Sequence, residues 1–164
     1  YQRRTSSTGV AWAARADVLR EVPLYQHCIV GGDDDAWYLA FMYDKADIKK
    51  VVKEQENQHF FKHASPEFMS HYLQWAEHCA SLVKQNVGYV DQTVFSYPHG
   101  KLRDRYYSTR QGVLHYFDPC NDVTYEAGGP LCWASRKPEL HQVVADYFYH
   151  RNEDAQVPLF SSPR

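Results

Sequence analysis

The sequence predicts a helix-rich α+β single domain with a small sheet, and three observations lead to that class. Apolar residues recur at three- and four-residue spacing over 66–86 and again over 138–151, which is typical of helices packed against a core. Only short runs between these segments have the character of strands. The chain has 164 residues without a repeat or a linker-like tract, so we expect one domain over 1–164 with loosely ordered tails at 1–8 and 155–164.

Taken in chain order, helical segments dominate. The expected helices are a turn from Ala16 toward Pro23, a buried helix over 36–43, a short helix around 48–52, the long helix 66–86, a charged helix 101–111 and a last helix 138–151. The expected strands are 9–15, 89–97, 123–125 and 131–133, and a turn begins at 117–119. Ser65 can cap the long helix, Pro66 fits its first position, and Gly88 is expected to end it.

Composition excludes several classes of protein before any motif is considered. Eighteen Lys and Arg against twenty Asp and Glu give a formal net charge of -2, so no strong field draws the chain to nucleic acid. No run approaches the ~18 apolar residues of a membrane span. The four cysteines lack zinc-ligand spacing, so we expect reduced thiols and a cytoplasmic protein. Aromatic residues reach 15% of the chain, and Tyr and Trp suit sugar and nucleotide sites as well as cores.

The first candidate site is the run Gly31-Gly32-Asp33-Asp34-Asp35. Three consecutive carboxylates repel one another, so they need a compensating partner. In a structural interpretation, Asp33 caps the following helix while Asp34 and Asp35 complement its dipole. In a functional interpretation, a carboxylate acts as general base toward a hydroxyl or binds a divalent cation, and the glycines let a ligand approach the backbone.

The second candidate site begins at His99, where a His-Gly pair precedes the charged helix. An imidazole beside a helix N-terminus suits a phosphate or a metal-bound phosphate. Arg103 and Arg110 are seven residues apart and therefore share one face of that helix, with Tyr106 near it. The alternative is a solvated basic helix. The other histidines are interpreted as surface residues or as satisfied by hydrogen bonds.

In this order, the segments resemble the C-terminal half of inverting, family-2-like glycosyltransferases of the GT-A fold, of the bacterial and phage kind. The matching segments are Gly9 to Arg15 with its embedded Trp, Gly31 to Asp34, His99-Gly100 with the basic Tyr-containing stretch up to Arg110, and Phe117-Asp118-Pro119 with Asp122. The resemblance implies the fold of the C-terminal part of a nucleotide-diphospho-sugar transferase. It also implies a nucleotide-sugar donor, a saccharide acceptor and a divalent cation, Mn²⁺ or Mg²⁺.

On the acceptor side, the resemblance assigns the acidic motif and one aromatic residue. Asp33 or Asp34 would be the base that deprotonates the acceptor hydroxyl, next to the substrate-binding glycines Gly31 and Gly32. Trp12 would pack under the acceptor sugar.

On the donor side, the resemblance assigns the second motif. His99 would contact the metal or the diphosphate, while Arg103 and Arg110, with Tyr106 beside them, would neutralise the departing diphosphate. In this family the N-terminal half supplies the nucleotide-binding strands and the D-x-D carboxylates. We therefore expect either that the natural chain extends upstream of Tyr1 or that this chain lacks donor binding.

Two alternatives stay open from the sequence. One is a non-catalytic carbohydrate- or partner-binding module that kept the shell of such an enzyme. The other is a metal-dependent hydrolase that uses the carboxylates of residues 33–35 together with His99.

Overall fold

The computed structural model describes residues 11–55, 61–93, 95, 105–107, 109–126 and 129–151. Its elements are α1 (Ala16–Glu21), α2 (Asp33–Met42), α3 (Ile48–Gln55), α4 (Pro66–Val83), the 3₁₀ helix η2 (Arg110–His115), β1 (Val123–Tyr125), β2 (Leu131–Trp133) and α5 (Pro138–His150). The described residues therefore form a helix-rich α+β domain with a two-stranded sheet, as the sequence predicts. The tails expected at 1–8 and 155–164 lie outside the described residues.

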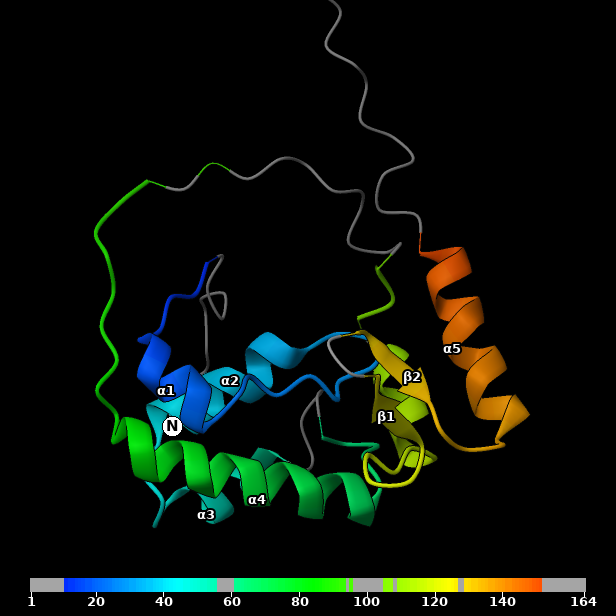
Figure 1. Ribbon diagram of the computed structural model, residues 1–164, viewed down its shortest axis with the longest axis horizontal. Coiled ribbons are helices and arrows are strands. Elements are labelled where there is room, and N and C mark those ends of the chain that lie inside the picture. Colours follow the sequence, from blue (N-terminus) through cyan, green and yellow to red (C-terminus); the bar gives the residue numbers. More distant parts are fainter. Residues whose placement is uncertain are drawn as a thin grey trace, which may run out of the picture.

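The core is organised around α4, the longest helix, against which α2 and α3 pack (Figure 1). Ser65 caps α4 as predicted, since its Oγ accepts a hydrogen bond from the Phe68 N–H at 3.0 Å. The Tyr72 hydroxyl donates to the carbonyl of Ala36 at 2.9 Å and so joins α4 to α2. The buried face of α4 carries the residues whose spacing predicted the helix: Phe68, Tyr72, Ala76, Cys79 and Ala80.

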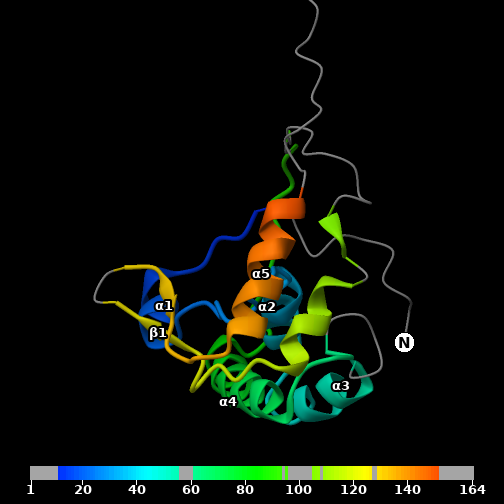
Figure 2. The same cartoon turned by 90° about the vertical axis from the view of Figure 1, so that its right-hand side faces the viewer.

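The hairpin and α5 form the other side of the molecule. β1 and β2 are antiparallel, and Thr124 pairs with Cys132. In both views α5 rises away from α4, and it packs against η2 (Figure 2). The buried Asp122 connects these parts, because its Oδ2 accepts from the Asp118 N–H and from Lys137 Nζ, each at 2.8 Å. The predicted turn at 117–119 is confirmed by the Asp118 carboxylate, whose Oδ1 accepts from the Cys120 N–H at 2.9 Å.

Two predicted strands are wrong where the structure describes them. Residues 11–15, part of the strand expected at 9–15, pair with no neighbouring strand among the described residues. The same holds for residues 89–93 and 95, where Tyr89 is 90% exposed and Phe95 is 91% exposed. A strand needs a partner to satisfy its backbone N–H and C=O groups, and composition does not reveal whether one exists.

Two helix predictions also need correction. α4 ends at Val83, well before Gly88, because Lys84 takes a left-handed conformation with φ 50°. The charged helix expected over 101–111 is not α-helical at 105–107 or 109–111. Tyr106 has φ 52°, which interrupts an α-helix, and a 3₁₀ helix begins at Arg110.

Candidate active site

The glycine pair before α2 makes the turn that presents the acidic motif. Gly31 and Gly32 have φ of 85° and 106°, a region that side-chain-bearing residues rarely adopt. Gly32 is the N-cap, and its carbonyl accepts from the N–H groups of Asp35 and Ala36 at 3.1 and 3.3 Å. The structural expectation that Asp33 caps this helix is therefore wrong, because Asp33 is already its first residue.

Asp33 is half-buried at the start of α2, and Asp34 follows it in the same turn. The Oδ1 of Asp33 accepts a hydrogen bond from the Cys28 N–H at 3.3 Å. Burial raises the pKa of Asp33 above its usual value, and the hydrogen bonds from Cys28 lower it by less. A carboxylate with a raised pKa is a stronger base, and the helix dipole favours negative charge at this place.

Arg110 is held against the glycine turn. A Cβ atom added to Gly31 would lie 3.2 Å from Nη1 of Arg110, so the guanidinium covers the space that a side chain there would need. Nη1 also donates to the Tyr147 hydroxyl at 3.3 Å. The guanidinium carbon lies 4.4 Å from the ring centroid of Tyr107, within range of a cation–π interaction. Gly31 and Arg110, which come from separate sequence motifs, are thus neighbours in space.

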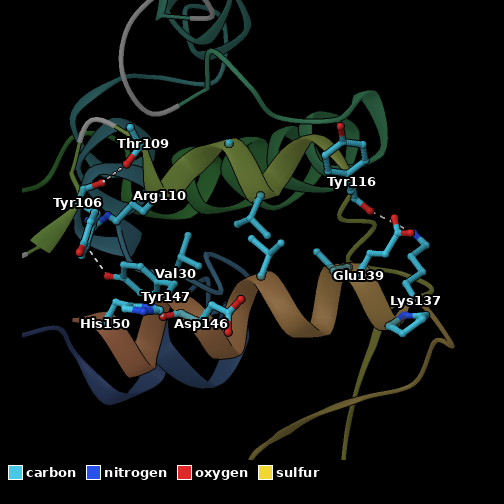
Figure 3. Close-up of a pocket in the computed structure, with 15 residues that line it drawn as sticks. Val30, Tyr106, Thr109, Arg110, Tyr116, Lys137, Glu139, Asp146, Tyr147 and His150 are labelled. Atoms are coloured by element: carbon cyan, nitrogen blue, oxygen red, sulfur yellow. Dashed lines mark hydrogen bonds between the residues drawn. The ribbon is translucent and has the colours of Figure 1, made fainter.

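A cavity of about 890 Å³ extends from Arg110 between η2 and α5 (Figure 3). At one end, Arg110 and Tyr147 point toward one another. At the other end, Lys137 Nζ donates to the carbonyl of Tyr116 at 3.1 Å. The middle is apolar, with Val113 among its lining residues, and the carboxylates of α5 that also line it are Glu139 and Asp146. Lys137 is already paired with the buried Asp122 at 2.8 Å, so Arg110 is the cation of this lining that an anion would meet. Arg110 beside an apolar floor suits an anionic group that is attached to a flat or apolar body.

The predicted site residues divide into three groups. Gly31 and Arg110 are in contact, and Tyr106 lines the same cavity as Arg110. Asp33 follows two residues after Gly31, but it is not among the residues that line that cavity. Trp12 lies apart from that cavity's lining, because its ring packs edge-on against Phe41 of α2 with centroids 5.6 Å apart. The two remaining candidates, His99 and Arg103, lie outside the described residues.

Sequence reasoning missed the contribution of α5. Tyr147 and the apolar positions beside it were expected to form a core face. In the structure Leu140 and Val144 are buried, whereas Val143 is 54% exposed and lines the cavity. The sequence signal available was the apolar stripe of α5 itself, which η2 packs against. Spacing within a helix shows which side chains share a face, and it does not show how much of that face is covered.

The described residues contain no group of three or more His, Cys, Asp or Glu side chains that could hold a metal ion. His99, which the family resemblance assigns to the metal, lies outside them. All four cysteines are free thiols, and Cys28 and Cys79 are buried. None of the described helices combines the length and the apolar character that a bilayer crossing requires. No family model, curated protein or solved structure matches the chain.

Proposed function

We propose that this chain is the acceptor-side, C-terminal part of a glycosyltransferase that transfers a sugar from a nucleotide-diphosphate donor to an acceptor hydroxyl. One observation carries the proposal: the Arg110 guanidinium lies directly against Gly31, two residues before the half-buried carboxylate of Asp33. Inverting transfer needs such a combination, a base for the acceptor and positive charge for the leaving diphosphate, within one site.

In the proposed reaction, Asp33 accepts the proton of the acceptor hydroxyl while that oxygen attacks the anomeric carbon. The bond from the anomeric carbon to the diphosphate breaks, and the leaving group departs as a nucleoside diphosphate that carries the additional charge. Arg110 stabilises that charge, and the Tyr107 and Tyr147 contacts fix the guanidinium beforehand. A divalent cation, Mn²⁺ or Mg²⁺, belongs to the proposal, and His99 is the residue that the family resemblance assigns to it.

Donor binding tests the role of Arg110. We expect Arg110→Gln to weaken the binding of nucleoside diphosphates to the natural full-length protein about tenfold or more, because a charge-assisted hydrogen bond is lost. Isothermal titration with uridine and guanosine diphosphates, with and without Mn²⁺, measures the effect. Arg20→Gln on α1 is the matched control, since Arg20 is exposed and outside the cavity lining.

Transfer kinetics test the role of Asp33. We expect Asp33→Asn to lower the rate of nucleoside diphosphate release in the presence of acceptor by about 100-fold or more, with donor affinity unchanged. Asp47→Asn, an exposed carboxylate before α3, is the matched control. The wild-type rate should fall as the pH drops, because protonated Asp33 cannot act as a base. The midpoint of that fall should lie at a higher pH than for an ordinary Asp, because burial raises the pKa of Asp33. Unchanged transfer by Asp33→Asn would show that another group is the base.

The alternatives make different predictions in the same assays. Saccharide binding without any affinity for nucleoside diphosphates would favour the non-catalytic carbohydrate-binding module. Metal-dependent release of phosphate from model esters, without sugar transfer, would favour the hydrolase.

A further inference from the structure

A second cavity, of about 790 Å³, lies on the other side of the segment that joins α1 to α2. That segment runs above α4 toward β1 (Figure 1). The cavity is formed by residues 23–27 of the segment, one face of α4, and Tyr125 of β1. The side chains that matter here are Tyr25, His27, His71, Gln74, Trp75 and Tyr125.

The aromatic wall of this cavity is fixed by its own contacts. The Trp75 indole Nε1 donates to the carbonyl of Pro23 at 2.8 Å, which sets the orientation of its ring. The rings of Tyr25 and Trp75 are 5.1 Å apart, and those of His27 and Tyr125 are 6.1 Å apart, measured between centroids. Because these contacts already fix the rings, a flat ligand would bind with little entropic cost for ordering the side chains.

Two histidines of this cavity, His27 and His71, have pKa values below the ordinary value. Burial lowers the pKa of His27 to about 4, with the neighbouring His71 adding to the effect, and burial also lowers the pKa of His71. The Tyr25 hydroxyl lies 3.1 Å from Nδ1 of His71. Burial raises the pKa of this hydroxyl and so keeps it protonated, and the tautomer of His71 determines which of the two groups donates. Neither imidazole therefore carries a charge, and each can still form hydrogen bonds.

His27 departs from the expectation that the remaining histidines are surface residues or satisfied by hydrogen bonds, because it is half-buried and lacks one partner among the described residues. Its Nδ1 is buried and has no hydrogen-bond partner within the described ranges. Its ring packs against that of His71, with centroids 4.5 Å apart. A buried nitrogen without a partner costs free energy, and a ligand hydroxyl in this cavity would supply the missing hydrogen bond.

No Lys, Arg, Asp or Glu side chain is among the described lining residues. Carboxylates do lie near this lining, since Glu21 Oε1 is 3.8 Å from Nε2 of His78. Asp33 also interacts electrostatically with Tyr25 and Tyr125, and Asp118 interacts with His71. This cavity therefore differs from the one at Arg110, which carries two cations. Aromatic faces with neutral donors and acceptors, and without fixed charge, match an uncharged ring that bears many hydroxyl groups.

We propose that this second cavity binds a neutral saccharide, with the sugar ring stacked on the wall of Trp75 and Tyr125 and its hydroxyls bonded to His27, His71 and Gln74. The saccharide-binding role does not depend on the proposed sugar transfer, because it concerns a different cavity and needs no donor. It does not involve Trp12, the aromatic residue that the family resemblance assigns to the acceptor sugar.

Saturation-transfer NMR on the chain, with a panel of neutral methyl glycosides and their disaccharides, tests the proposal. The expected result is transfer to at least one member of the panel, together with a shift of the Trp75 indole N–H that is assigned by its loss in Trp75→Phe. Tyr125→Ala should weaken binding about five- to tenfold, since one stacking face is lost. Tyr149→Ala is the matched control, because Tyr149 is 86% exposed on α5 and lines neither cavity.

Tyr125 is half exposed and Gln74 is exposed, so Tyr125→Ala and Gln74→Ala should both keep the fold, which circular dichroism verifies. Failure of the whole panel to receive saturation would overturn the proposal. So would a sugar that binds without shifting the Trp75 indole, or one that binds Tyr125→Ala as well as wild type. A shift of that indole by nucleoside diphosphate or Zn²⁺, with no shift by any neutral sugar, would assign the cavity to a different ligand.

Discussion

Replacing Ser65 by alanine should destabilise the whole domain, because its side chain joins α4 to the turn before β1. The Oγ accepts from the Phe68 N–H at 3.0 Å and donates to the carbonyl of Phe117 at 2.6 Å. Ser65 is only 4% exposed, so water cannot replace either bond. Loss of the cap costs about 1 kcal/mol, and the orphaned carbonyl of Phe117 costs roughly 1–3 kcal/mol more. We expect Ser65→Ala to lower the free energy of unfolding by about 2–4 kcal/mol, or the Tm by roughly 5–15 °C.

Urea titration followed by circular dichroism at 222 nm measures this loss. Ser70→Ala is the matched control, because Ser70 lies on the exposed face of α4 and should be neutral or slightly stabilising as alanine. The m-value should stay the same in both variants. If Ser65→Ala cost no more than Ser70→Ala, the Oγ would not make the two buried bonds, and the connection between α4 and the turn would rest on apolar packing alone.

Four further predictions concern backbone conformation and pH. Gly31→Ala should cost about 1–2 kcal/mol in a urea titration, because φ is 85° there and the new Cβ meets the Arg110 guanidinium. Lys84→Gly should stabilise the domain by about 0.5–1 kcal/mol in the same assay, since glycine adopts φ 50° without strain. The pKa of His27 is about 4 in the folded state against an ordinary 6.5, so the unfolded chain binds more protons between these pH values. Stability should therefore fall as the pH drops from 6.5 to about 4, and His27→Gln should make the urea midpoint depend less on pH in that range. Burial raises the pKa of Asp122, but its hydrogen bonds outweigh burial and hold the pKa below 3.8. The stability that this carboxylate contributes should therefore be lost as the pH falls below 3.8, and Asp122→Asn should reduce that loss.

The helices were predictable because their signals are local. A serine, a proline and an apolar stripe at three- and four-residue spacing identify α4 within a single stretch of sequence. The strands were predictable only in the hairpin 123–133, where the two partners are close in sequence. At 11–15 and 89–93, apolar and aromatic composition indicated strands, but no pairing segment lies beside them among the described residues. Whether a segment pairs with another strand depends on the tertiary fold, and a strand prediction from local composition assumes that such a partner exists.

The candidate site was predictable in its parts and not in its assembly. Gly31 and Arg110 were each selected from a motif, yet their contact joins two segments that are about 79 residues apart in the sequence. Nothing in the sequence indicates the hydrogen bond between Tyr147 and Arg110, because Tyr147 lies in the apolar stripe of an ordinary amphipathic helix. The sequence likewise does not indicate the contact of His71 on α4 with Tyr25, because the two residues are 46 positions apart in the chain. Aromatic and histidine side chains serve cores and sites alike, so only their neighbours distinguish the two.

The two cavities share one wall, and this determines which variants can separate their functions. Tyr25 and His27 line the second cavity, Val30 lines the first, and Gly31 touches Arg110, so one segment contributes to both linings through different residues. A ligand that moves this segment in one cavity must also move the turn that presents Asp33. We therefore expect backbone-altering substitutions within the segment to affect both cavities. Only the outer walls, formed by α4 and β1 on one side and by η2 and α5 on the other, allow one cavity to be altered while the other stays intact.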